Sequence, residues 1–97
     1  MTISKTMDGD KLIIALEGRL DTITAPELEK DLSGTLDNVS ELVFDCEKME
    51  YISSAGLRVL LAIQKMMGDK PMKVTKVNEI VQEVFEVTGF SDIITVE

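Results

Sequence analysis

The stretch that decides the fold is Leu42–Met67, "LVFDCEKMEYISSAGLRVLLAIQKMM". Its first part belongs to a short apolar run over Glu41–Glu47, which predicts a buried strand near the centre of a sheet. Its last part, Ala55–Met67, is apolar on most sides and predicts a buried helix, ended by "GDKP". Two adjacent serines, Ser53 and Ser54, stand where this helix begins, and each could cap the helix or carry a chemical function.

The chain before this stretch predicts a hairpin and a helix. Strands over Ile3–Met7 and Lys11–Glu17 are joined by a turn at "DGD". The second strand is almost continuously apolar, which indicates burial on both faces. Thr24 and Glu27 then match a capping box at the start of a helix, with Pro26 in the first turn.

The chain after this stretch repeats the alternation. Met72–Val77 predicts a fourth strand, Asn78 caps a third helix that stops at Gly89, and Phe90–Val96 forms a last short strand or tail. The resulting order predicts one α/β domain over residues 1–97. We expect a sandwich in which a mixed sheet of four to five strands has helices packed over it.

Composition excludes several classes of function. The 97 residues include no histidine and one cysteine, Cys46, and they carry a formal charge of −8. Without histidine, neither a Ser-His-Asp triad nor a Cys-His pair can form, so we expect no enzyme, no metal site and no cofactor. The acidic charge disfavours nucleic acid. No signal peptide or membrane-spanning run is visible, which predicts a cytoplasmic protein without membrane insertion.

The two serines admit two interpretations. Serine is a preferred N-cap, worth about 1 kcal/mol over alanine, and capping alone would explain them. However, their loop follows a central strand, where α/β sheets usually place their working surface. Positions 54, 58, 62 and 65 also share one helix face, so Ser54 stands at the head of a polar stripe that includes Arg58. A hydroxyl at that place is a candidate for phosphorylation, because a helix N-terminus favours an anion.

The loop "GRLDTITAP" contains Asp21 and Thr22 and follows the second strand as the serine loop follows the third. A simple strand-to-helix turn would account for it, with Asp21 or Thr22 making local hydrogen bonds. If the two strands run parallel, both loops emerge at the same edge of the sheet. Cys46 is expected in the core, with nothing nearby in sequence to activate its thiol.

Three stretches, in order and covering nearly the whole chain, resemble the anti-sigma factor antagonists, which are small single STAS domains of bacterial partner-switching systems. "LEGRLDTITAPELE" looks like the family's G-[ED]-[LI]-D loop and first helix. "LVFDCEKMEYISSAGLRVLL" resembles the strand, phosphorylation loop and second helix. "VTKVNEIVQEVFEVTGFSDIITV" is similar to the last part of the family's fold.

The resemblance places Ser54 on the family's phosphorylated serine. Ser53 then stands where many members have Asp, and Ala55 stands on their second Ser or Thr. The resemblance implies that the unphosphorylated domain binds an anti-sigma factor that is also a serine kinase, and so frees a sigma factor. Phosphorylation of Ser54 would end the interaction, and a metal-dependent serine phosphatase would reset it.

The surface around Ser54 is expected to bind these partners. The candidate partner-binding residues are Asp21, Thr22, Ser53, Gly56 and Arg58. The chain is expected to be a monomer or a weak dimer. The alternative is a STAS adaptor subunit of a transporter or signalling scaffold, in which both serines only cap the helix and no phosphorylation occurs.

Overall fold

A computed structural model describes residues 1–97 and contains one five-stranded sheet, whose strands lie in chain order. The strands pair antiparallel between the first and second and parallel everywhere else. The strands are β1 Thr2–Asp8, β2 Lys11–Leu20, β3 Glu41–Ile52, β4 Met72–Thr75 and β5 Thr95–Val96. The helices are α1 Ala25–Leu32, α2 Ser54–Met67, α3 Glu79–Val87 and the single 3₁₀ turn η1 Phe90–Asp92. The predicted mixed α/β sheet is confirmed, with β3 at its centre.

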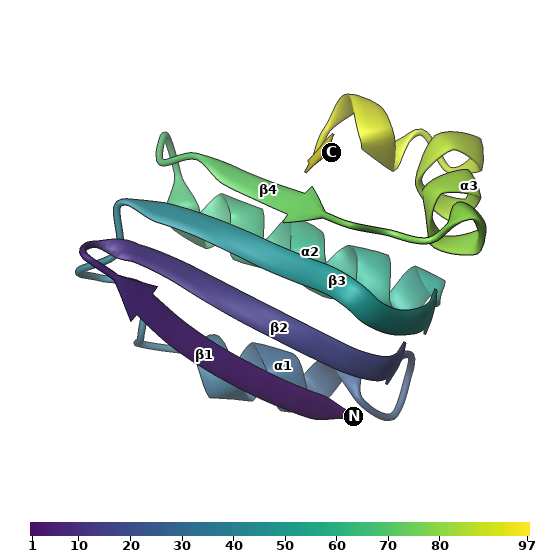
Figure 1. Cartoon of the computed structure of the whole chain (residues 1–97). Helices are drawn as coiled ribbons and strands as arrows, with labels where there is room; N and C mark the ends of the chain where they lie inside the picture. Colours follow the sequence, from purple (N-terminus) through teal and green to yellow (C-terminus); the bar gives the residue numbers. More distant parts are fainter.

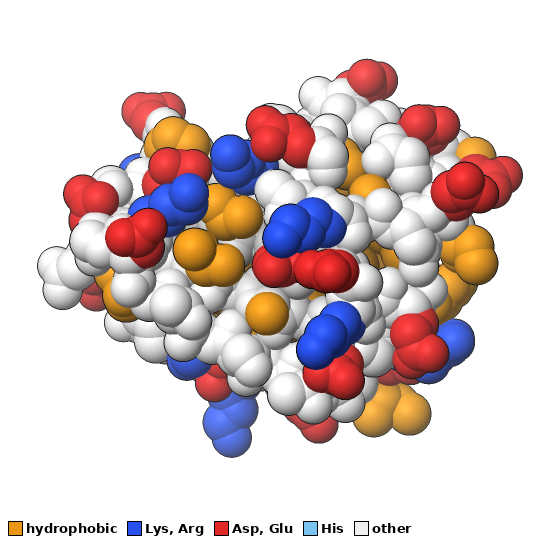
Figure 2. Space-filling view, viewed as in Figure 1, with side chains coloured by type: hydrophobic (Ala, Val, Ile, Leu, Met, Phe, Trp, Pro, Cys, Tyr) orange, Lys and Arg blue, Asp and Glu red, His pale blue; other side chains and the backbone are white.

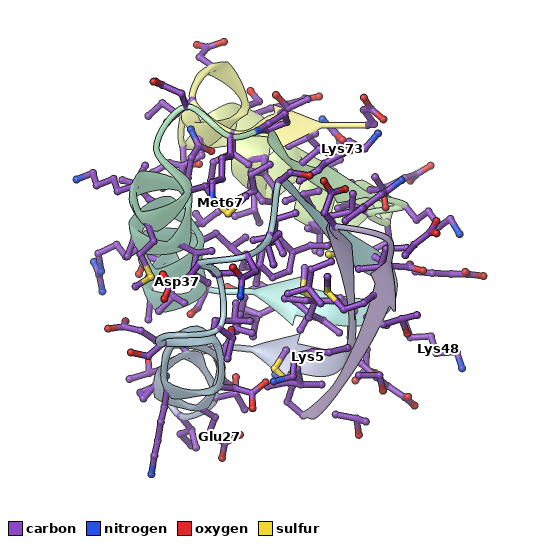
Figure 3. All side chains as sticks on the ribbon, turned by 90° about the vertical axis from the view of Figure 1, so that its left-hand side faces the viewer. Lys5, Glu27, Asp37, Lys48, Met67 and Lys73 are labelled. Atoms are coloured by element: carbon purple, nitrogen blue, oxygen red, sulfur yellow. The ribbon has the colours of Figure 1, made fainter.

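The helices α1 and α2 cover only one face of the sheet (Figure 1). The side view in Figure 3 shows Lys48 extending away from both helices, while Lys5 points from β1 toward α1. There the Lys5 Nζ lies 3.1 Å from the Asp31 Oδ2 of α1. The domain therefore has two layers, one of helices and one of strands, and the second face of the sheet is open to solvent.

This one-sided cover corrects the prediction for β2. Leu12, Ile14 and Leu16 are buried. Ala15, which lies between Ile14 and Leu16, is exposed, and so is Glu17, which follows Leu16. The strand is buried on one face only, because no helix crosses the other face. The apolar run misled the prediction because Ile13 and Ala15 are apolar residues on the open side.

The open face of the sheet is charged rather than apolar. Figure 2 shows Lys and Arg side chains interspersed with Asp and Glu across it, around a smaller group of hydrophobic side chains. Three ion pairs join charged side chains in this region. Lys73 lies 3.6 Å from Glu97, and Lys76 lies 3.8 Å from Asp45 and 3.8 Å from Glu47. Such exposed pairs add little stability, roughly 0–1 kcal/mol each.

The core lies between the sheet and the helices and contains 24 buried residues. Phe44 of β3 and Phe85 of α3 are its largest members, and both are fully inaccessible to solvent. Cys46 is buried as expected, and burial raises the pKa of its thiol to about 12. The core rests otherwise on aliphatic side chains, as the scarcity of aromatic residues requires.

Several strand lengths differ from the predictions, and β4 ends at Thr75 instead of Val77. β3 continues to Ile52 instead of ending at Glu47, because β2 also runs on to Leu20 and pairs with it over this length. The segment Phe90–Val96 forms η1 and then only the two-residue strand β5. None of the helices has the length and apolar character needed to cross a bilayer. The long β2–β3 pair carries two loops to one edge of the sheet.

Candidate functional site at the ends of β2 and β3

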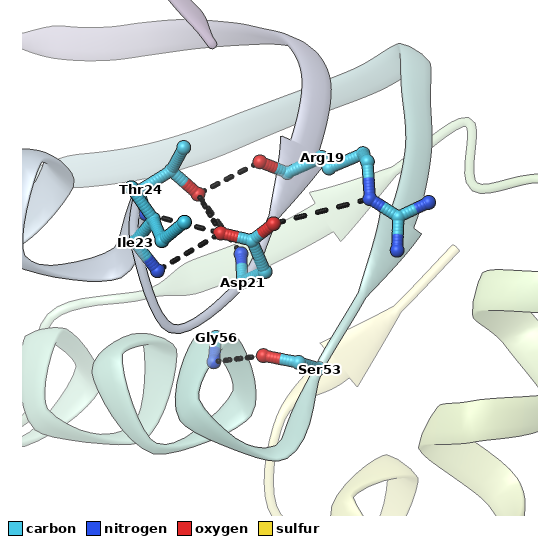
Figure 4. Close-up of polar contacts among 6 residues, drawn as sticks. All are labelled: Arg19, Asp21, Ile23, Thr24, Ser53 and Gly56. Carbon is cyan, nitrogen blue, oxygen red and sulfur yellow. Dashed lines mark hydrogen bonds and ion pairs between the residues drawn. The ribbon is translucent and has the colours of Figure 1, made fainter.

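The two loops singled out in the sequence begin side by side. β2 and β3 are parallel, and their last paired residues are Leu20 and Ile52. Immediately beyond, the backbone N–H of Ser53 donates to the carbonyl oxygen of Leu20 at 2.9 Å. The prediction that both loops emerge at the same sheet edge is therefore confirmed, and Figure 4 shows them together.

The structure distinguishes the two serines. Ser53 is the N-cap of α2, and its Oγ accepts a hydrogen bond from the backbone N–H of Gly56 at 3.3 Å. Ser54 is the first helical residue, its side chain is exposed, and its hydroxyl has no hydrogen-bond partner. One serine alone meets the capping requirement of the helix. The hydroxyl of Ser54 is left free for other chemistry.

Gly56 holds this loop close to β2. It is buried in the first turn of α2, and a Cβ added there would lie 2.7 Å from the Leu20 carbonyl oxygen and 2.8 Å from the Ile52 Cγ1. Any side chain would push the start of the helix away from the strand ends. Among the candidate partner-binding residues, Gly56 thus lies beneath the surface and supports the loop from below.

Asp21 organises the β2–α1 loop. Its Oδ1 accepts hydrogen bonds from the backbone N–H groups of Ile23 and Thr24, at 3.0 and 3.1 Å, and its Oδ2 lies 3.9 Å from the Arg19 Nε (Figure 4). The Thr24 N–H is the largest cause that lowers the pKa of Asp21, with smaller contributions from the Ile23 N–H, the Thr24 hydroxyl and the Arg19 charge. The carboxylate stabilises the turn in its charged form.

The predicted capping box at Thr24 is wrong. Thr24 stands at the N-cap of α1, but its side chain makes no capping bond. Its hydroxyl instead donates to the Arg19 carbonyl oxygen at 2.7 Å and accepts from the Asp21 N–H at 2.9 Å. The physical reason is that the Thr24 hydroxyl is already bonded to the backbone of Arg19 and Asp21, at the end of β2 and just after it, and so is not available to cap α1.

Thr22 and Arg58 face an open groove of about 560 Å³ between α1 and α2. Both side chains are exposed, and the guanidinium of Arg58 takes part in no hydrogen bond or ion pair. The groove wall includes apolar and basic side chains: Pro26, Lys30, Ala55, Arg58 and Met66. Ser54 directly precedes Ala55, which lines this groove.

Sequence reasoning missed two members of the site. Arg19 stacks over the ring of Tyr51, with its Cζ 4.7 Å from the ring centroid, and so fixes the end of the β2–β3 pair. Ile23 projects from the Asp21 loop and is 79% exposed. The sequence did contain a sign of Ile23, because it is a large apolar residue in an otherwise polar loop, where no buried side chain is required.

The comparisons with known proteins agree with this geometry. Residues 2–97 match the STAS domain family model. BtrV of Bordetella bronchiseptica, a candidate anti-sigma factor antagonist, is 35% identical over 99 residues, covering 99% of this chain and 84% of BtrV. The chain belongs to the STAS domain family and, within it, to the anti-sigma factor antagonists, a regulatory rather than catalytic family.

Solved structures confirm the fold. A crystal structure of an anti-sigma factor antagonist from Mycobacterium paratuberculosis has a TM-score of 0.88 at 23% identity, covering 98% of this chain and 83% of that one. The antagonist SpoIIAA in its unphosphorylated form has a TM-score of 0.85 at 16% identity, covering 99% and 88%. SpoIIAA of Bacillus has also been solved in a phosphorylated form, with a TM-score of 0.75 at 15% identity, covering 99% and 91%. At these identities the likeness concerns the fold alone.

Proposed function

We propose that this domain is a phosphorylation-controlled antagonist. In its unphosphorylated form it binds an anti-sigma factor that is also a serine kinase, and this binding releases a sigma factor. The kinase transfers a phosphoryl group from ATP to the Oγ of Ser54, and the hydroxyl proton is released. The modified domain dissociates, and a metal-dependent serine phosphatase hydrolyses the phosphate ester and restores the hydroxyl.

The observation that carries the proposal is the division between the two serines. Because Ser53 caps α2, phosphorylation of Ser54 costs the helix no capping bond. The Ser54 side chain is exposed and unpartnered, so a kinase can reach it without unfolding the loop. The phosphorylated form of SpoIIAA supports the proposal by example, since a domain of this fold exists in that state.

Electrostatics gives the direction of the switch. A phosphate adds about −1.5 to −2 charges at neutral pH, and the first turn of a helix accommodates such a charge. The fold is therefore retained while the docking surface changes. In a chain of formal charge −8, the added charge repels acidic partner surfaces and must be desolvated when a partner binds.

The docking surface is formed around Ser54 by four exposed or half-buried residues from the two loops and α2. Asp21 and Thr22 come from the β2–α1 loop, Ser53 directly precedes Ser54 as the N-cap of α2, and Arg58 lies one turn after Ser54 on α2. In this proposal the kinase binds the ATP and the phosphatase binds the metal ion.

The test combines detection of the phosphate with binding of the kinase. Peptide mass spectrometry of the protein from its native cells is expected to find phosphate on Ser54. Ser54→Ala is expected to bind the kinase and to resist release by ATP, and Ser54→Asp to bind at least tenfold more weakly. Ser4→Asp is the matched control, because Ser4 is exposed on the opposite face of the sheet.

The contrary outcome is equally definite. If Ser54 stays unmodified under every growth condition, and Ser54→Asp binds the kinase as tightly as Ser4→Asp, the switch is excluded. The chain would then act as an adaptor without a phosphorylation switch, and the free hydroxyl of Ser54 would have no regulatory role.

A further inference from the structure

Arg58 is a cation without an acidic partner in its own helix. α2, "SAGLRVLLAIQKMM", contains no aspartate or glutamate. The side chains one turn before Arg58 are those of Ser54 and Ala55, and one turn after it lie Leu61 and Ala62. Of these four, Ser54 alone carries a group that can become an anion.

The spacing from Ser54 to Arg58 suits an ion pair. Residues four apart on a helix have Cβ atoms about 5–6 Å apart, and an acid placed N-terminal to the base is the more favourable order. Both side chains are exposed, so Arg58 can change rotamer without disturbing the core. Its planar guanidinium can also bind a phosphate through two parallel N–H···O bonds.

Arg58 also decides the charge of the α1–α2 groove. Three ionisable side chains line that groove: Glu29, Lys30 and Arg58. Glu29 makes no ion pair with either cation. The unmodified groove is therefore net positive by one charge, on a chain that is strongly acidic elsewhere.

We propose that phosphoserine at position 54 pairs with Arg58 within the same helix and so removes the free cation from the groove. This inference rests on the proposed phosphorylation of Ser54. The phosphate then acts in two ways: it adds negative charge at the helix start, and it occupies the guanidinium that a partner carboxylate would otherwise meet. With a phosphate of about two charges, the groove and its end change from net positive to net negative.

The experiment installs the phosphate without a kinase. The full chain is produced with phosphoserine incorporated at position 54 during translation, in the wild-type background and with Arg58→Gln, Arg58→Lys or Lys65→Gln. Lys65→Gln is the matched control, since it removes an equal charge from the same helix face, three turns from Ser54. Phosphorus NMR measures the second pKa of the phosphate, and nitrogen NMR follows the Nε of Arg58.

Pairing with Arg58 is expected to lower the phosphate pKa, because it favours the dianion. In low salt the value should be about 0.2–0.4 of a unit lower in wild type and Lys65→Gln than in Arg58→Gln, with Arg58→Lys between them. The difference should shrink at high salt. The Arg58 Nε signal should shift when the phosphate is present.

An identical phosphate pKa in wild type and Arg58→Gln, with an unmoved Arg58 signal, would overturn the pairing. That result would leave the switch at Ser54 intact. Conversely, an unmodified Ser54 in cells would end the proposed function without affecting the pair measured in the installed phosphoprotein. The two failures are therefore distinguishable.

Discussion

The Oγ of Ser53 accepts a hydrogen bond from the backbone N–H of Gly56 at 3.3 Å, so Ser53 caps α2 and the hydroxyl of the neighbouring Ser54 is left without a capping role. Ser53 has extended backbone angles, with φ −97° and ψ 175°, as an N-cap requires. The register is set at the same residue, because the Ser53 backbone N–H donates to the Leu20 carbonyl oxygen at 2.9 Å. The end of β2 thus fixes which serine begins α2.

The two serines should differ in their effect on stability. Ser53→Ala removes the capping bond and should lower the free energy of unfolding by about 1 kcal/mol. Ser54→Ala removes no hydrogen bond and should stay within roughly 0.5 kcal/mol of wild type. Urea denaturation monitored by circular dichroism measures both variants. Equal losses for the two would show that the cap is shared between them.

Gly56→Ala should destabilise the fold despite improving helix propensity. The new Cβ would lie 2.7 Å from a backbone oxygen of Leu20, which cannot move without shifting β2. Overpacking of this kind costs about 1–3 kcal/mol, against a gain of about 1 kcal/mol from replacing glycine in a helix. We expect a net loss of up to about 2 kcal/mol in urea denaturation.

Ala62→Gly provides the control for Gly56→Ala. Ala62 is half-buried on the same helix, so its replacement measures the propensity change without a new contact. If Gly56→Ala were as stable as wild type or more so, α2 would not be held against the Leu20 carbonyl. The function of the site would then need no close approach at this point.

The sequence predicted the order of elements and the meeting of the two loops because both follow from local patterns. Alternating strand and helix signals predict parallel strands, whose carboxyl ends share an edge. The helix face and the family resemblance singled out Ser54 for phosphorylation, but capping preference alone could not say which of the two serines caps the helix, because both are good caps. The choice depends on the bond from Ser53 to Leu20, a contact between distant segments.

Two predictions from local sequence patterns were wrong, because contacts between distant segments decided the outcome. The apolar run of β2 predicted two buried faces, but burial depends on which face the helices cover, and Ala15 lies on the open one. The pattern at Thr24 predicted a capping box, but a carbonyl of the preceding strand, that of Arg19, competes for the Thr24 hydroxyl. Local patterns record what a residue can do, whereas tertiary contacts decide which option is used.

The buried thiol of Cys46 should make stability fall in alkali. Its pKa is raised from 9.0 to about 12 by burial and by the nearby charge of Asp45, so the folded state keeps the proton that the unfolded state loses. Stability should therefore decrease as the pH rises from about 9 toward 12. Urea midpoints of wild type and Cys46→Ala measure this, because the difference between them isolates the thiol from other titrating groups. A gap between the two that does not change with pH would contradict the prediction.

Native Cys46 should also resist thiol reagents. At pH 8 the folded chain should incorporate no iodoacetamide over a time in which the chain in guanidinium is fully labelled, because the thiolate is the reactive form. Mass spectrometry counts the labels. Rapid labelling of the native chain would show that the β3 core opens locally.

The charge of Asp21 should matter only above the pH at which it ionises. Its folded-state pKa is below the ordinary 3.8, since the N–H groups of Thr24 and Ile23 favour the carboxylate. A lowered pKa contributes stability that is complete above the pKa of the unfolded state and is lost as the pH falls through the pKa of the folded state.

Asp21→Asn tests this charge, because it keeps an oxygen that can accept these hydrogen bonds but removes the negative charge. Its deficit in urea midpoint against wild type should be present at pH 7 and should disappear as the solution is acidified through the lowered pKa of the folded-state carboxyl. Carbon NMR of the wild-type carboxyl should give a midpoint under 3.8, and a midpoint at or above that value would show that the loop does not bind the carboxylate in its charged form.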